Sequence, residues 1–187
     1  MGSKSLSTRA NWQAEANKSG LKGEKLVGAE LHKHLPSHFD IELKPPKIVV
    51  YSGGKGIQLD LKVTNGKNNK CVFIEVKTGS NGGNCTEERA AKFLSTGIEK
   101  KIKALVPGVV SQPVLSVFQG PIFEGTDTWR TKPTKSQPNG SLIDPPLYRE
   151  KVALIFEGHE YSIICNKYAD TYGDLAKKVK KVLDNQK

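Results

Sequence analysis

The chain has 187 residues, of which 36% are hydrophobic, so it is long enough for a single domain with one substantial core. Its formal net charge of +10 favours a polyanionic partner, either nucleic acid or an anionic membrane surface. No run approaches the roughly 20 apolar residues of a membrane span, and no signal-peptide pattern is present. The cysteines Cys71, Cys85 and Cys165 are widely spaced and fit neither a zinc site nor a disulfide framework, which indicates a reducing cytoplasm.

The first predicted element is a helix from Asn11 to about Leu35, which Pro36 ends. Leu26 and Ala29 are expected on its buried side, with Leu31 as a further candidate. Three histidines follow closely, but Pro36 separates them and they are interpreted as surface residues; they are His32, His34 and His38.

Two segments with a polar turn between them predict a β-hairpin. Residues 57–63 and 71–77 are rich in β-branched and aromatic residues, and residues 64–70 have a typical turn composition. In a simple antiparallel hairpin about this turn, positions whose numbers sum to 135 face each other, which puts Asp60 opposite Glu75. Directly opposed residues have Cβ atoms roughly 4.5 to 5.5 Å apart, close enough for two carboxylates to share one cation. Because side chains alternate along a strand, Glu75 and Lys77 share a face.

Two acids and a lysine on one patch are the parts of a metal-dependent phosphodiesterase. A hard cation such as Mg²⁺ neutralises charge on the phosphate and lowers the pKa of the attacking water. Asp60, Glu75 and the Val76 carbonyl would supply oxygen ligands for it, and Lys77 would orient the water or steady the phosphate. Glu24 in the first helix is a further acid within reach of this centre, although a solvated helix acid is the alternative interpretation.

An acid, any residue and a lysine is a frequent pattern in so basic a chain. It occurs at 42–44, 60–62, 75–77 and 99–101, and each instance taken singly fits an exposed ion pair worth roughly 0 to 1 kcal/mol. What distinguishes Glu75 and Lys77 is the preceding acid, Asp60, in an apolar segment at hairpin distance. The alternative, Asp60 with Lys62, would also need a preceding acid on a neighbouring strand. The candidate acids lie before Pro45 and Pro46, so pairing their segment with the strand of Asp60 would need a wider connection.

A second helix is predicted from Asn84 to about Leu105. Asn84 is a suitable N-cap with Glu87 three residues on, and Ile98 and Ile102 belong to the apolar stripe. The first turn therefore presents Asn84, Glu87, Glu88 and Arg89 together, an arrangement that can place side chains against DNA base edges. The 29 lysine and arginine residues include only four arginines, so Arg89 and Arg130 are the natural base-contact candidates. Surface capping or solubilisation is the alternative role for both.

The remaining chain predicts three further features. A short buried strand spans 114–118, and 151–157 with 161–165 indicates a second hairpin around Gly158 and His159. Between them, the Pro/Gly-rich loop at about 124–150 is too long for a passive connector and is either a DNA-embracing loop or disordered. A final helix, 174–185, combines a side of Leu175, Val179 and Val182 with a lysine-rich face that suits either backbone phosphates or solvent.

Asp60 followed by Glu75, Val76 and Lys77 resembles the PD-(D/E)xK nuclease motif, and the surrounding residues resemble the MunI-like enzymes of the EcoRI-like group of type II restriction endonucleases. The segment 9–14 is similar to the start of these enzymes, Gly23 and Glu24 match an early Gly-Glu pair, and Gly83 to Arg89 resembles a GNAxER segment. The similarity spans roughly the first 105 residues. Two departures stand out: Leu59 replaces the proline of the motif, and the recognition segment has one extra residue, with Cys85 in place of alanine.

The resemblance implies an α/β, restriction-endonuclease-like fold, a mixed central sheet flanked by helices in one nuclease domain spanning 1–187. It implies a homodimer that cuts double-stranded DNA at a short palindrome with Mg²⁺. Metal binding would fall to Asp60 and Glu75, catalysis to Lys77, and a supporting role to Glu24. Recognition would fall to Asn84, Cys85, Glu88 and Arg89. A repair or junction-resolving PD-(D/E)xK nuclease, or a basic DNA-binding module without catalysis, remains the alternative.

Overall fold

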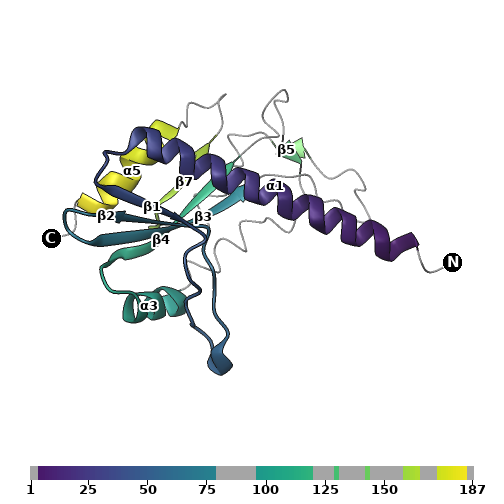
Figure 1. Ribbon diagram of the computed structural model, residues 1–187, viewed down its shortest axis with the longest axis horizontal. Helices are drawn as coiled ribbons and strands as arrows, with labels where there is room; N and C mark the ends of the chain where they lie inside the picture. Colours follow the sequence, from purple (N-terminus) through teal and green to yellow (C-terminus); the bar gives the residue numbers. More distant parts are fainter. Residues whose placement is uncertain are drawn as a thin grey trace.

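A mixed five-stranded sheet between helices forms the centre of the computed structural model, which describes residues 4–78, 96–119, 129–130, 142–143, 158–164 and 172–184 (Figure 1). The helices are α1 (Lys4–His34), α3 (Thr96–Leu105) and α5 (Tyr172–Asp184), with a 3-10 turn η1 (Ser52–Gly54). The strands are β1 (Phe39–Leu43), β2 (Leu61–Asn65), β3 (Lys70–Thr78), β4 (Val109–Gln119), β5 (Trp129–Arg130), β6 (Leu142–Ile143) and β7 (Tyr161–Ile164).

The sheet has the order β1-β2-β3-β4-β7. β2 runs antiparallel to both β1 and β3, whereas β4 runs parallel to both β3 and β7. β3 is therefore the central strand, and its residues 71–76 are all buried because both faces of the sheet are covered. The mixed α/β fold predicted from the sequence is confirmed.

The predicted hairpin register is confirmed. β2 pairs with β3 through Leu61↔Ile74 and Val63↔Val72, so paired numbers sum to 135 as expected. The predicted first strand, 57–63, is wrong at its start, since β2 begins at Leu61. Ile57 leaves the sheet and forms only an isolated bridge with Ile48, in an excursion that Pro45 and Pro46 begin.

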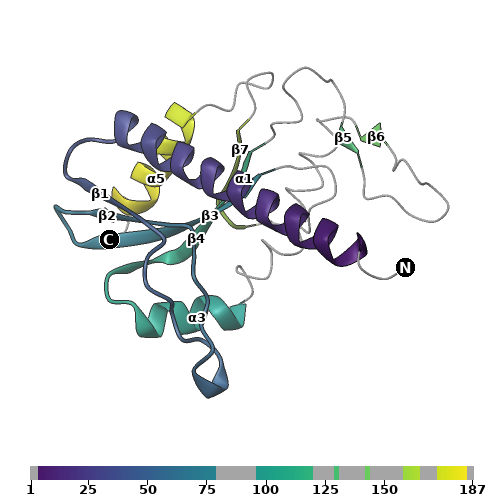
Figure 2. The same ribbon diagram turned by 45° about the vertical axis from the view of Figure 1, so that its right-hand side comes forward.

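The helices cover the two faces of the sheet (Figures 1 and 2). α1 and α5 lie together on one face, where their apolar side chains join Leu61, Val72, Ile74 and Val117 in one buried cluster. α3 lies on the opposite face and buries Ile98 and Ile102, two of the predicted stripe residues. In this three-layer arrangement, the carboxyl end of β3 lies beside α1, and α3 covers the other face of the sheet.

The face of α1 that is buried differs from the prediction. Leu26 is 46% exposed and Ala29 is exposed, whereas Leu31 is fully buried. The buried stripe is formed by Val27, Leu31 and Leu35, which follow one another at the four-residue spacing of a helix face. α1 also begins earlier than expected, at Lys4, and ends at His34 before Pro36.

In the second half of the chain, some predicted elements are found in the structure and others lie outside the described residues. The strand expected at 114–118 forms the second half of the longer β4, and the final helix buries Leu175 and Val179. Residues 84–95 of the predicted second helix, and 151–157 of the second hairpin, lie outside the described residues. Within the predicted loop 124–150, β5 and β6 pair as a short antiparallel ladder. None of the helices in the described ranges is long and apolar enough to cross a bilayer.

Replacing Leu31 with alanine tests the assignment of the buried face of α1. Leu31→Ala removes a side chain with no solvent exposure and should lower the free energy of unfolding by about 2 to 5 kcal/mol. Leu26→Ala, the matched exposed control on the same helix, should change it by less than about 0.5 kcal/mol. Urea unfolding followed by circular dichroism measures both, and equal losses would contradict the assignment.

Candidate active site

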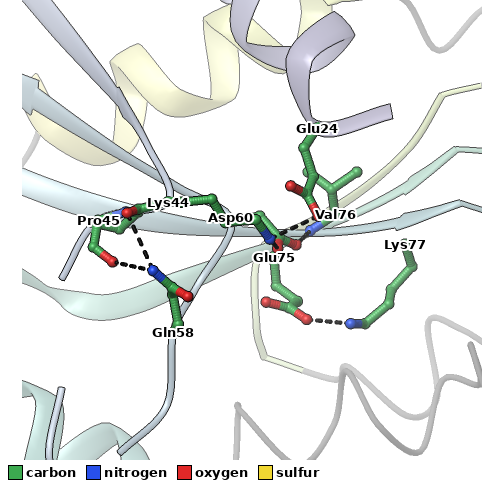
Figure 3. A network of polar contacts seen from close by, with 8 residues as sticks. All are labelled: Glu24, Lys44, Pro45, Gln58, Asp60, Glu75, Val76 and Lys77. Carbon is green, nitrogen blue, oxygen red and sulfur yellow. Dashed lines mark hydrogen bonds and ion pairs between the residues drawn. The ribbon is translucent and has the colours of Figure 1, made fainter. Parts of the chain in front are cut away.

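Three acids and two lysines meet where β2, β3 and α1 come together (Figure 3). α1 supplies Glu24, the residue after β1 is Lys44, and the residue before β2 is Asp60. β3 supplies Glu75 and Lys77. All five come from elements that the central sheet fixes relative to one another, so their positions follow from strand pairing and helix packing.

Asp60 is held by its backbone and by both carboxylate oxygens. Its N–H donates to the Ile74 carbonyl at 3.2 Å, which continues the β2–β3 ladder by one residue. Oδ2 accepts the Val76 N–H at 2.7 Å, and Oδ1 lies 2.5 Å from the Lys44 Nζ. The side chain is 9% exposed. A buried carboxylate with fixed oxygens is a suitable start for a cation site.

Glu75 is buried on the central strand and forms an ion pair with Lys77 two residues on. The shared face expected for these two residues is confirmed by this contact. Burial raises the pKa of Glu75 to about 7; Lys77 opposes that rise, and the nearby Asp60 charge adds to it. Glu75 Oε2 is buried without a hydrogen-bond partner in the described part of the protein.

Glu24 and Lys44 complete the cluster from the side of α1. The Lys44 Nζ lies 2.8 Å from Glu24 Oε1. Burial raises the pKa of Glu24, which the hydrogen bond from Lys44 lowers only in part. Burial tends to lower the pKa of Lys44, but hydrogen bonds to Asp60 and Glu24 outweigh it, so the net direction is upward. Glu24 Oε2 also has no partner among the described residues.

The donor set fits a hard divalent cation. Lys44 pairs with Asp60 and Glu24, Lys77 pairs with Glu75, and two buried carboxylate oxygens are unpartnered within the described chain. Mg²⁺ binds through one or two carboxylates together with water and substrate oxygens, so it does not require a closed protein cage. The described residues contain no ready-made group of three metal-ligating side chains. Figure 3 shows why: the Glu75 carboxylate is turned toward Lys77, away from Glu24.

The structure places Asp60, Glu75, Lys77 and Glu24 near one another, and their roles in catalysis and metal binding remain predictions. Val76 lies beside them and its N–H contacts Asp60; the metal-binding role of its carbonyl remains a prediction. The predicted recognition residues lie outside the described residues, and so does the side chain of Arg130; they are Asn84, Cys85, Glu87, Glu88 and Arg89.

Lys44 is the site residue that the sequence analysis missed. β1 pairs with β2 through Leu43↔Leu61, and the next step of that register places Lys44 opposite Asp60, where the Lys44 N–H donates to the Asp60 carbonyl at 2.8 Å. The available signal was the alternating segment Phe39–Leu43, in which Phe39 is buried and Asp40 exposed. Recognising it as a strand would have identified a partner for β2 and placed Lys44 at the site.

Comparisons with known proteins place the fold. No protein-family model matches the chain, and no curated protein matches it. Among solved structures, the chain is similar to restriction endonuclease MunI, determined in complex with cognate DNA, with a TM-score of 0.50 and 17% sequence identity. The alignment covers 90% of this chain and 98% of the MunI chain. The protein therefore has a restriction-endonuclease-like fold.

The raised pKa of Glu75 predicts how stability depends on pH. A carboxyl group whose pKa rises from 4.5 to about 7 on folding binds its proton more tightly in the folded state. The folded state therefore holds more protons between these values, and the free energy of unfolding falls as pH rises from about 4.5 to about 7. Glu75→Gln should remove this part of the pH dependence, which amounts to a few kcal/mol at most.

Urea unfolding in EDTA at several pH values measures this effect. The matched control is Glu42→Gln, at an exposed acid on β1, which should keep the wild-type pH dependence. A Glu75→Gln protein whose stability follows the same pH curve as the wild type would show that Glu75 ionises as in the unfolded chain.

Proposed function

We propose that this protein is a Mg²⁺-dependent type II restriction endonuclease, which hydrolyses phosphodiester bonds of double-stranded DNA at a short palindromic site. The observation that carries the proposal is the pair of buried acids, Asp60 next to β2 and Glu75 on the paired strand β3, with Lys77 beside Glu75 in a MunI-like fold. This set combines oxygen ligands for a hard cation with an ammonium group beside them, as phosphodiester hydrolysis requires.

Each residue of the cluster has a role in this proposal. Asp60 and Glu75, with the Val76 carbonyl, would hold Mg²⁺, which supplies charge neutralisation at the phosphate and a more acidic bound water. Lys77 would leave its ion pair with Glu75 and use its ammonium to orient the attacking water or the phosphate oxygen. Glu24 would support the centre from α1. The Val76 N–H keeps Asp60 in the orientation that cation binding needs.

The DNA-binding part of the proposal rests on charge and on the similar structure. The net charge of +10 favours a polyanion, and MunI was determined with its cognate DNA. Base recognition is assigned to the segment after β3 and to Arg130; the residues are Asn84, Cys85, Glu87, Glu88 and Arg89. A homodimer of this single-domain chain, 1–187, would present two equivalent sites to the two strands of a palindrome.

Replacing Asp60 tests the catalytic assignment. Asp60→Asn should lower the rate of Mg²⁺-dependent plasmid cleavage by roughly 100-fold or more, because it removes a charged metal ligand. DNA binding in a gel-shift assay without metal should persist, since Asp60 is buried and its proposed role is to bind the metal ion, not the DNA. The matched control is Asp40→Asn, at an exposed position on β1, which should cleave at the wild-type rate.

Sequencing the ends of digested genomic DNA tests the specificity. One fixed palindrome at every end supports a restriction endonuclease. Ends without a common sequence would instead indicate another nuclease of this fold, and binding without any cleavage would indicate a DNA-binding module. Cleavage by Asp60→Asn at the wild-type rate would remove Asp60 from the site.

A further inference from the structure

Lys44 places a positive charge where a cation at Asp60 would bind. Its Nζ bridges Glu24 Oε1 at 2.8 Å and Asp60 Oδ1 at 2.5 Å (Figure 3). The other Asp60 oxygen accepts the Val76 N–H at 2.7 Å, so both oxygens are engaged. A divalent cation on Asp60 would lie within a few ångströms of the ammonium group. At that separation two positive charges repel each other, and the low exposure of the Asp60 and Glu24 side chains limits screening by solvent.

The backbone of Lys44 is held firmly beside Asp60. Its N–H donates to the Asp60 carbonyl at 2.8 Å, and Gln58 Nε2 donates to the carbonyls of Lys44 and Pro45 at 3.3 and 3.1 Å. Lys44 has a φ of +50°, in the left-handed region that non-glycine residues rarely adopt. These constraints fix the point from which the side chain starts, directly opposite the buried carboxylate.

The side chain of Lys44 is the movable member of this contact. It is 39% exposed, whereas the Asp60 and Glu24 side chains are 9% and 12% exposed. A lysine stem has four flexible carbons, so the ammonium can move into solvent without a change in the sheet. Asp60 keeps the hydrogen bond from the Val76 N–H when the ammonium leaves, so its carboxylate stays in place.

We propose that Lys44 is an internal counter-ion: in the metal-free protein its ammonium neutralises Asp60, a proposed metal ligand, together with the neighbouring Glu24, and it is displaced when a divalent cation binds to Asp60. The inference rests on the proposed metal-dependent function and adds the residue that sets metal affinity. Lys44 acts as a positioning residue, because it offsets the charge of two buried acids until the metal replaces it. Lys77 does not duplicate this role, since it pairs with Glu75.

Metal binding without DNA tests the proposal directly. Titration of Mn²⁺ into Lys44→Met, followed by electron paramagnetic resonance, should show tighter binding than in the wild type, on the order of ten-fold or more. The metal-free variant should also unfold at a lower temperature, because Asp60 and Glu24 lose their counter-charge. Lys62→Met is the matched control: it removes the same charge two residues from Asp60, and it should change Mn²⁺ affinity far less.

A measurement on the wild type accompanies the variant. Ca²⁺ should increase acetylation of Lys44 by acetic anhydride, read by mass spectrometry with Lys62 as the internal reference, because displacement frees the ammonium from two ion pairs. If Lys44→Met does not fold, Mn²⁺ titration of Lys44→Gln and acetylation of the wild type test the counter-ion role. Equal or weaker Mn²⁺ binding by a folded variant, or labelling that Ca²⁺ leaves unchanged, would overturn the counter-ion role alone. A wild type that binds no Mn²⁺ would overturn the metal-dependent function as well.

Discussion

The pairing of β2 with β3 is the constraint on which the site depends. Its register brings the residue before Leu61 level with the segment that contains Glu75 and Val76, and the Asp60 N–H continues the ladder to Ile74. The hydrogen bond from the Val76 N–H then fixes the Asp60 carboxylate. A shift of one residue in this register would turn Glu75 toward the apolar cluster beneath α1 and α5, and would bring Val76 to the opposite face of the sheet. The core and the cluster of acids are therefore specified by the same pairing.

Charge balance is the second constraint. Burying carboxylates is unfavourable unless cations or hydrogen bonds offset their charge, and here the burial raises the pKa of both Glu24 and Glu75. Lys44 and Lys77 offset that cost from opposite ends of the cluster. The two oxygens that they leave without partners in the described chain are the features that a divalent cation would satisfy. Ionising these buried acids in the folded state is therefore unfavourable, and under the proposed function a divalent cation would offset that cost.

Local sequence patterns predicted those parts of the fold whose interacting residues are close together in the sequence. The turn composition and the alternating strands were sufficient for the β2–β3 register, and with it for the positions of Asp60 and Glu75. The buried face of α1 was predicted correctly at Leu31 and wrongly at Leu26 and Ala29, because Leu26 and Leu31 are equally apolar and only packing against the sheet selects Leu31. Lys44 was missed because the segment from Pro45 to Leu59 separates β1 from β2 in the sequence. No local sequence pattern indicates a pairing between strands that are so far apart.

The central claim is that Asp60 and Glu75 share one divalent cation. Anomalous diffraction from crystals grown with Mn²⁺ measures this most directly. We expect an anomalous peak for Mn²⁺ between the two carboxylates, within about 2.3 Å of an oxygen from each, with the Glu75 side chain turned away from Lys77. A peak bound by other residues, with Glu75 still paired to Lys77 and Asp60 still paired to Lys44, would contradict it.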